Sequence, residues 1–256
     1  ASDVYKRQIA DCVAKADVLT SLSEIAVENN YCKPEIDESD DFIVKNGRHA
    51  VLEKILPLGE YVPNDLDLKS KSTNDSTQFM ILTGPNMAGK STYMRQNALI
   101  AILAQIGSWV PADYVKLGVV DKVFTRVGAS DDLTLGQSTF MVEMIETSFI
   151  LNTATDRSFI LLDEIGRGTS TYDGVAIAWS VAEYIATKVG ARCIFATHYH
   201  ELNVMTKTYP QIKNYRITIT ENNGEIEFLR KIVQGGASKS YGIQVARMAG
   251  LPSSVV

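Results

Sequence analysis

A glycine-rich segment has the composition and spacing of a loop that binds phosphate. Residues 84–91 read GPNMAGKS and fit the pattern G-x-x-x-x-G-K-[ST], between an apolar run at 79–83 and a helical pattern at 90–105. Glycines let the backbone approach a phosphate closely, and free N–H groups at a helix start attract an anion. We expect Lys90 to reach the β- and γ-phosphates of a nucleotide and the Ser91 hydroxyl to bind Mg²⁺. A chance glycine-rich turn is the alternative, and the flanking strand and helix argue against it.

Two adjacent acids end a second apolar run. Asp163 and Glu164 follow the residues FILL at 159–162. A buried parallel strand delivers the residues at its carboxyl end to the ligand edge of a sheet. We expect Asp163 to hold the Mg²⁺ shell and Glu164 to orient or deprotonate the attacking water. Two solvated acids at a strand end are the alternative, which the preceding phosphate loop makes less favoured.

A histidine ends a third apolar run, at 192–197. His198 lies one strand–helix unit after the acidic pair, a position that suits a sensor of the γ-phosphate. His200 follows at a spacing that metal clusters also use, but no further His or Cys cluster is near in sequence, so zinc is not expected. We interpret His200 as structural or at the surface, and His49 as packed or hydrogen-bonded.

Strand-like and helical patterns alternate from residue 78 onward. Apolar strands at 79–83, 121–128, 159–164 and 192–198 alternate with helices at 90–105, 138–153 and 174–187. This alternation predicts an α/β fold with a mostly parallel sheet flanked by helices. Short β-like runs at 41–47 and near Tyr61 and Val62 predict an added β layer. Residues 215–233 predict a C-terminal β-hairpin over an NNG turn, 241–249 a short helix and 5–30 a long one.

Composition limits the classes of function. The 256 residues are 45% hydrophobic and 21% charged, with a formal net charge of −5, which argues against a broad basic face for DNA. Cys12, Cys32 and Cys193 are odd in number and form no CxxC spacing, as is typical of reduced cytosolic thiols. No apolar stretch reaches the length of a membrane span, and the acidic start is no signal peptide. That start resembles a helix already under way, which predicts a fragment of a longer chain.

Several motifs coincide in one order: TGPNMAGKSTYMRQ, RVGASDDL, QSTFMVEM, LLDEIGRGTSTYDG and FATHYHEL. Together they resemble the C-terminal ATPase domain of the MutS family of DNA mismatch repair proteins, in its bacterial form. That family is related to the ABC-type ATPases. The resemblance covers nearly the whole chain. It implies a P-loop NTPase fold of ABC-ATPase type at 35–256, preceded at 1–34 by the end of the helical lever and core region, with ATP and Mg²⁺ as cofactors.

The resemblance also assigns roles to single residues. Glu164, His198 and Lys90 are expected to be catalytic, with Ser91 and Asp163 as Mg²⁺ ligands. Ser138 is expected to reach the γ-phosphate bound by the other subunit, although a simple helix cap is its alternative role. Tyr61 is expected to stack on adenine or to belong to the core. The remaining nucleotide contacts are Gly84, Pro85, Asn86, Met87, Ala88, Gly89 and Thr92, where Ala88 departs from the glycine usual in the family.

The function that the resemblance implies is a nucleotide cycle coupled to mismatched-DNA binding and repair signalling. The expected partners are a second subunit through residues 166–174, mismatched double-stranded DNA through domains absent from this chain, and a MutL-type repair protein. The bacterial cytosol is the expected location, without membrane contact. Three alternative classes of protein fit the sequence less well. The nuclease-linked MutS paralogue usually has the phosphate loop GPNTGGKT and lacks STFMVEM. A transporter nucleotide-binding subunit would carry an LSGGQ motif, which this sequence lacks. The intact Glu164 argues against a clamp that binds ATP without hydrolysing it.

Overall fold

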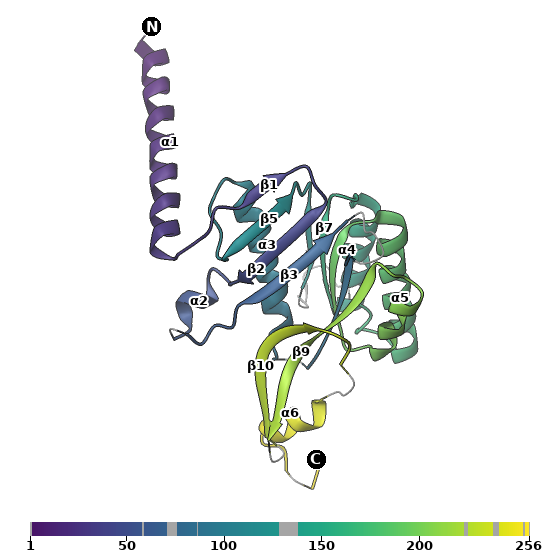
Figure 1. Ribbon diagram of the computed structural model, residues 1–256. Coiled ribbons are helices and arrows are strands. Elements are labelled where there is room, and N and C mark those ends of the chain that lie inside the picture. Colours follow the sequence, from purple (N-terminus) through teal and green to yellow (C-terminus); the bar gives the residue numbers. More distant parts are fainter. Residues whose placement is uncertain are drawn as a thin grey trace.

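Two β-sheets form the body of the protein (Figure 1). The computed structural model describes residues 2–57, 59–70, 76–85, 87–127, 138–222, 225–237, 241–252 and 254–255. The larger sheet has the strand order β10-β9-β4-β8-β7-β6. Its strands are β4 (Phe79–Thr83), β6 (Val123–Arg126), β7 (Phe159–Asp163), β8 (Arg192–Thr197), β9 (Ile212–Asn222) and β10 (Glu225–Gln234).

The larger sheet is mixed. Neighbouring strands from β9 through β4, β8 and β7 to β6 are parallel, whereas β10 pairs antiparallel with β9 at its edge. β4 and β8 lie in the middle, and all their residues are buried. An apolar strand without alternation is what a parallel sheet covered on both faces requires. The expected α/β class is therefore confirmed, and the parallel strands bring the ends of β4, β7 and β8 to one edge.

Helices pack against both faces of this sheet. α3 (Lys90–Gln105) packs on one face, where Met80, Leu82 and Ile194 point toward it. On the other face, Phe79, Ile81 and Phe195 pack with the second group of helices. That group is α4 (Thr139–Thr153), α5 (Thr171–Tyr184), its π-helical continuation η1 (Ile185–Val189) and the 3₁₀ helix η2 (His200–Lys207). The predicted start of the helix at residue 174 is wrong by three residues, because Ser170 caps α5 by accepting from the Asp173 N–H at 3.3 Å.

The smaller sheet covers α3 from outside, with strand order β1-β5-β2-β3. Its strands are β1 (Glu35–Asp37), β2 (Asp41–Gly47), β3 (Asn64–Lys69) and β5 (Tyr114–Gly118). The β-like run predicted near Tyr61 and Val62 lies slightly later in the chain, since β3 begins at Asn64. β3 alternates buried Leu66 and Leu68 with exposed acids. β5 was not expected, and it joins this sheet by pairing with β1 and β2 after α3 has been completed.

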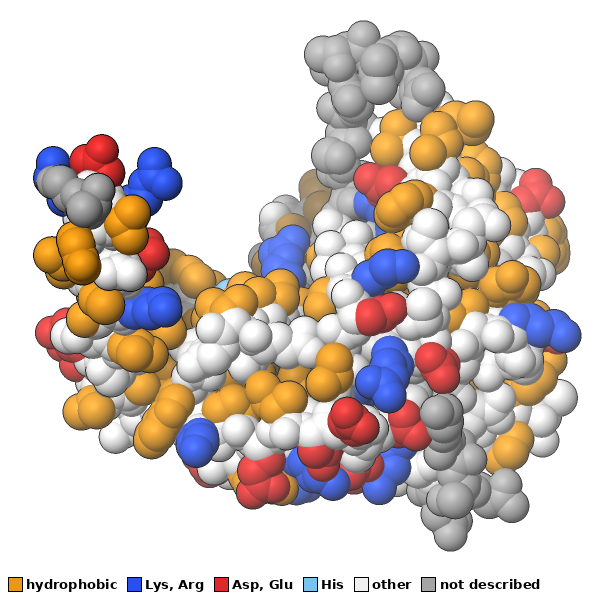
Figure 2. All heavy atoms as spheres, turned by 90° about the horizontal axis from the view of Figure 1, so that it is seen from above, with side chains coloured by type: hydrophobic (Ala, Val, Ile, Leu, Met, Phe, Trp, Pro, Cys, Tyr) orange, Lys and Arg blue, Asp and Glu red, His pale blue; other side chains and the backbone are white. Residues whose placement is uncertain are grey.

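Helix α1 (Ser2–Glu28) stands away from the body (Figure 1). Its apolar positions are mostly exposed, with Ile9 at 64% and Val13 at 62%. Figure 2 shows hydrophobic side chains exposed on the part of the protein at the left of the view, and shows basic and acidic side chains interspersed over the visible face. The Arg48 guanidinium holds the end of α1 by donating to the carbonyls of Asn29 and Asn30 at 3.0 and 3.1 Å.

Two further short helices follow strands of the two sheets. α2 (Leu52–Ile55) follows β2, and α6 (Gly242–Met248) follows β10. His49 is buried and precedes α2, where its Nδ1 accepts from the N–H groups of Val51 and Leu52 at 3.3 and 3.4 Å. Burial lowers the pKa of His49. In the described part of the chain, no helix is both long enough and apolar enough to span a membrane.

One buried arginine links the two sheets. Arg192, at the start of β8, is 1% exposed. Its guanidinium donates to the carbonyls of Asp41 (3.2 Å), Gly118 (3.1 Å), Val119 (3.3 Å) and Arg157 (2.9 Å). The carbonyls of Asp41, Gly118 and Val119 lie in or next to the smaller sheet. The Arg157 carbonyl lies just before β7 of the larger sheet, so a single side chain satisfies backbone acceptors of both layers.

Replacing Arg192 with methionine is expected to lower the free energy of unfolding by about 3–5 kcal/mol, because buried carbonyls lose their charged donor. Urea denaturation followed by circular dichroism measures the change. Arg157→Met is the matched control, since the Arg157 side chain is exposed and only its carbonyl accepts from Arg192. We expect less than about 0.5 kcal/mol for that control. Equal effects of the two variants would contradict the linking role of Arg192.

Candidate functional site

The phosphate loop joins the end of β4 to the start of α3. Gly84 and Gly89 have φ angles of 150° and 106°, and Gly89 lies at the N-cap of α3. Both angles lie in the region that favours glycine, which explains the residue type at each end of the loop. Met87 also has a positive φ, 69°, and its side chain is 80% exposed. Asn86, expected to contact nucleotide, lies outside the described residues.

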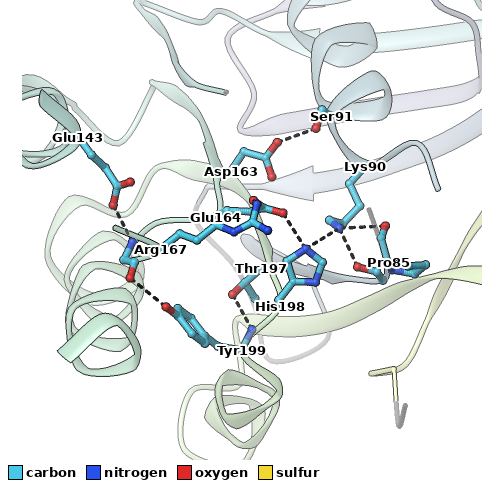
Figure 3. A network of polar contacts seen from close by, with 12 residues as sticks. Pro85, Lys90, Ser91, Glu143, Asp163, Glu164, Arg167, Thr197, His198 and Tyr199 are labelled. Carbon is cyan, nitrogen blue, oxygen red and sulfur yellow. Dashed lines mark hydrogen bonds and ion pairs between the residues drawn. The ribbon is translucent and has the colours of Figure 1, made fainter. Parts of the chain in front are cut away.

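Lys90 is buried and turns back onto its own loop. Its Nζ donates to the carbonyls of Gly84 at 2.7 Å and Pro85 at 3.1 Å, and lies 3.5 Å from Nε2 of His198 (Figure 3). Burial lowers the pKa of Lys90 to about 8, although the nearby carboxylates of Glu164 and Asp163 oppose this change. The ammonium group is therefore charged at neutral pH and poorly solvated, a condition that favours binding of an anion.

Ser91 and Asp163 meet at the sheet edge. The Ser91 hydroxyl donates to Oδ2 of Asp163 at 2.6 Å, while Oδ1 of Asp163 is buried and has no hydrogen-bond partner among the residues that the structure describes. Burial raises the pKa of Asp163. An unpartnered buried carboxylate oxygen beside a hydroxyl fits a hard divalent cation, because Mg²⁺ takes oxygen ligands and would satisfy that oxygen. The residues present therefore fit the Mg²⁺ ion that the sequence predicts.

Glu164 and His198 form a pair next to Lys90. His198 Nε2 lies 2.6 Å from Oε1 of Glu164, and the Arg167 guanidinium pairs with Oε2 of Glu164 (Figure 3). The hydrogen bond from His198 is the main cause that lowers the pKa of Glu164, so this carboxylate is ionised at neutral pH. Glu164 has a φ of 57°, an unfavourable conformation for a residue with a side chain. Strained residues of this kind cluster at functional sites.

A cavity of about 240 Å³ opens beside the phosphate loop. Tyr61 lines it, and the Tyr61 hydroxyl donates to Oε1 of Gln96 on α3 at 2.7 Å. Burial raises the pKa of Tyr61 to about 12. Ala88 also lines the cavity and is fully buried, so this departure from glycine fits the fold without exposing its methyl group. The full lining is Leu52, Leu56, Tyr61, Val62, Asn64, Met87, Ala88, Gly89, Thr92, Tyr93, Arg230 and Ile232.

The far wall of the cavity was missed by sequence reasoning. Arg230 lies in β10 with a φ of 54°, where the pairing register with β9 shifts between Phe228 and Ile232. Asn64 joins this wall to β3: its Nδ2 donates to the Arg230 carbonyl at 2.9 Å, and its Oδ1 accepts from the Ile232 N–H at 2.8 Å. The break of alternation in FLRKI is the local signal that could have indicated a bulge here.

Ser138 is not part of the cluster around Lys90. It is exposed at the N-cap of α4 and accepts from the Met141 N–H at 3.2 Å. Among the described residues, the hydrogen bonds that join Lys90, Asp163 and Glu164 to their neighbours do not include Ser138. The helix-cap role of Ser138 is therefore visible, and a role toward a second subunit stays a prediction. His200 starts η2 and is half-buried.

Comparison with known proteins identifies relatives of the chain. Residues 80–256 match the family described as MutS domain V. The DNA mismatch repair protein MutS of Thermodesulfovibrio yellowstonii is 58% identical over 94% of this chain and 28% of the relative. The proteins of the same name from Acetivibrio thermocellus and Clostridium botulinum are 57% and 54% identical, over 96% and 98% of this chain. The chain spans 27% to 28% of the length of these relatives.

Proposed function

Because this chain belongs to the MutS family, we propose that its site binds ATP with Mg²⁺ and hydrolyses the bond to the γ-phosphate. The proposal includes an ATPase domain of ABC type at 35–256 and the end of a lever and core region at 1–34. One observation carries it: the ends of β4, β7 and β8 bring Lys90, Asp163, Glu164 and His198 together at one sheet edge. A phosphate loop beside an acid pair is the arrangement that phosphoryl transfer requires.

Each group in the site has a separate task in this mechanism. The N–H groups of the loop bind phosphate oxygens, and the Lys90 ammonium contacts the β- and γ-phosphates. Ser91 and Asp163 hold Mg²⁺, which when bound neutralises charge on the phosphate oxygens. The ionised Glu164 orients the attacking water and accepts its proton at a carboxylate oxygen. His198 positions Glu164 by donating from Nε2, and lies where it can also contact the γ-phosphate.

The cavity beside the loop is the proposed site for the base. Tyr61 offers an aromatic ring whose hydroxyl is already held by Gln96, so stacking on adenine costs little side-chain entropy. Arg230 lines the same cavity from β10 and offers a guanidinium plane for a second contact. The remaining proposed nucleotide contacts are Gly84, Pro85, Asn86, Met87, Ala88, Gly89 and Thr92.

The proposed working unit is a dimer of ATPase domains. Ser138 offers a hydroxyl and free helix N–H groups at an exposed helix start, a combination that suits the γ-phosphate of a nucleotide in the other subunit. Residues 166–174 supply the facing loop. Composite sites of this kind explain why Ser138 lies apart from the cluster around Lys90 in one subunit.

Mixing two inactive variants tests the composite site. Ser138→Ala and Lys90→Ala chains are each expected to lose turnover, since each damages both sites of a homodimer. Equal mixing is expected to restore about one working site per mixed dimer, because both lesions then fall on the same composite site. Steady-state ATP hydrolysis, with analytical ultracentrifugation to measure the dimer fraction, is the readout. Dimers that form without any recovered activity would contradict action across subunits.

The whole protein's role is proposed from its relatives, which are named as DNA mismatch repair proteins. We propose that the nucleotide state of this domain controls binding of mismatched double-stranded DNA by other domains and recruitment of a MutL-type partner in the bacterial cytosol. The net charge of −5 agrees with DNA contacts that lie mostly elsewhere.

Hydrolysis itself is tested by following ADP release from ATP with Mg²⁺ and with excess EDTA, at several protein concentrations. We expect turnover only with Mg²⁺ and a rate per chain that rises with concentration as dimers form. Turnover that is independent of Mg²⁺, or none at any concentration despite nucleotide binding, would count against the proposed enzyme.

A further inference from the structure

Helix α4 carries a buried carboxylate on the face that it turns toward the sheet. Glu143 is 7% exposed and shares this face with Thr147 and Ile150, the other buried residues of the helix. These residues follow at spacings of four and three, the period of one helix face. A buried carboxylate is unfavourable unless it is hydrogen-bonded and paired. The partners of Glu143 therefore indicate its task.

Glu143 binds the turn that follows the acidic pair. Its Oε1 accepts from the Gly166 N–H at 2.6 Å, and its Oε2 lies 3.9 Å from Nη2 of Arg126 at the end of β6. Figure 3 shows Glu143 reaching from its helix toward this turn. A backbone N–H that donates to a carboxylate forms a stronger hydrogen bond than one that donates to a neutral acceptor. α4 is thus tied to the residue two positions after Glu164.

Gly166 is held from three sides. Besides the bond to Glu143, its carbonyl accepts from the Tyr199 hydroxyl at 2.9 Å, and Tyr199 directly follows His198. On the third side, a Cβ at Gly166 would clash with the carbonyl of Gly174 in α5. The place of this turn is therefore determined by α4, by α5 and by the segment after β8.

The backbone at Glu164 depends on such support. Glu164 holds a φ of 57°, and its own N–H donates to the Ala196 carbonyl at 2.9 Å. An unfavourable conformation persists only where the surroundings determine it from several directions. The Ala196 carbonyl holds the backbone at the N–H of Glu164 itself. Glu143 holds it two residues later, at the N–H of Gly166.

We propose that Glu143 is a positioning residue for hydrolysis: by holding the Gly166 N–H, it sets the place of the Glu164 carboxylate from helix α4. The inference rests on the proposed role of Glu164 in turnover. Ser138 caps the same helix, so a movement of α4 caused by a second nucleotide at Ser138 reaches Glu164 through this hydrogen bond. Glu143 thereby connects Ser138, which faces the site of the other subunit, with Glu164, which activates water in the site of the same subunit.

Two substitutions separate the reach of Glu143 from its charge. Glu143→Gln keeps the acceptor oxygen at full length and loses the charge, whereas Glu143→Asp keeps the charge and is too short to reach Gly166. Glu146→Gln is the control, one turn of the same helix away, where the side chain pairs with Arg126 and is 47% exposed. For each chain, kcat, KM, the affinity for a non-hydrolysable ATP analogue, the melting temperature and hydrogen exchange of amides 165–170 are measured.

We expect Glu143→Asp to lower kcat about 10- to 100-fold, with KM and analogue affinity within about three-fold of the unsubstituted chain. Exchange at 165–170 should rise about ten-fold in this variant. Glu143→Gln and Glu146→Gln should stay near the unsubstituted values. Unchanged kcat and exchange in Glu143→Asp, or equal loss in Glu143→Gln, would overturn the proposal. So would failure of Glu143→Asp to fold, because Glu143 is then needed for the whole domain.

The same measurements separate this inference from the function on which it rests. If the unsubstituted chain binds the analogue but shows no Mg²⁺-dependent turnover, the proposed function fails, and the exchange data still decide whether Glu143 holds the turn. If the unsubstituted chain turns over ATP normally, but Glu143→Asp and Glu143→Gln have the same kcat and the same hydrogen exchange, the proposed function stands and the positioning role of Glu143 is contradicted.

Discussion

Replacing Glu164 with glutamine is expected to lower kcat for ATP at least about 100-fold while ATP stays bound. The amide cannot accept the proton of the attacking water, yet its oxygen can still accept from Nε2 of His198, so the site keeps its shape. Loss of the negative charge near the γ-phosphate leaves binding unchanged or tighter. Single-turnover ADP formation gives the rate of the chemical step, and a fluorescent ATP analogue gives the affinity.

The control for this substitution is Glu201→Gln. Glu201 is exposed in η2, three residues after His198, so it tests whether any loss of acidic charge near the site slows turnover. We expect the control to keep the original kcat. Turnover by Glu164→Gln close to that of the unsubstituted chain would remove Glu164 from the mechanism and leave the acid pair with Asp163 alone as a functional group.

Replacing Lys90 with methionine is expected to weaken ATP binding at least about 100-fold, because a buried cation that pairs with phosphate is lost. Stability should change by less than about 1 kcal/mol, since the lost hydrogen bonds to Gly84 and Pro85 are offset by removal of a poorly solvated charge. Titration calorimetry and urea denaturation measure the two quantities. Lys122→Met is the control: its exposed amine donates to the Thr153 carbonyl at 2.7 Å, away from the loop.

The lowered pKa of Lys90 adds a test by pH. With a pKa of about 8 in the free protein, the amine is largely charged at pH 7 and largely neutral at pH 9. Because phosphate binds the charged form, affinity should fall by about ten-fold from pH 7 to pH 9. The weak binding by Lys90→Met should show no such fall. A flat profile for the unsubstituted chain would show that Lys90 does not contact the phosphates in its charged form.

Local patterns predicted the loop, the acids and the strands that carry them. β4 and α3 lie where the sequence predicts them, because the signals for a short apolar strand, a glycine-rich turn and a helix each depend on residues that are neighbours in the sequence. Asp163 and His198 were expected at strand ends for the same reason. Their joint position at one edge also follows, since parallel strands share an edge. Their roles toward ATP stay predictions.

Features that depend on distant partners could not be predicted. Arg230 reaches the cavity from a strand about 140 residues beyond the loop, and only the fold brings it near Tyr61. Nothing in the sequence of α4 marks Glu143 as buried, because its partner Gly166 lies 23 residues further along the chain. Side-chain burial of this kind is decided by packing, which no local period encodes.

The strand order of the smaller sheet has a consequence for synthesis of the chain. Among the strands that the structure describes, β1 pairs only with β5, and β2 needs β5 on one side, yet β5 is made only after the phosphate loop and α3. While the chain emerges from the ribosome, the edge of β2 therefore stays open until Tyr114–Gly118 appear. Open strand edges invite pairing with other chains. A nascent or truncated chain that ends before Tyr114 is thus expected to aggregate or to need a chaperone. The longer chain is not, because its β5 covers the edge of β2.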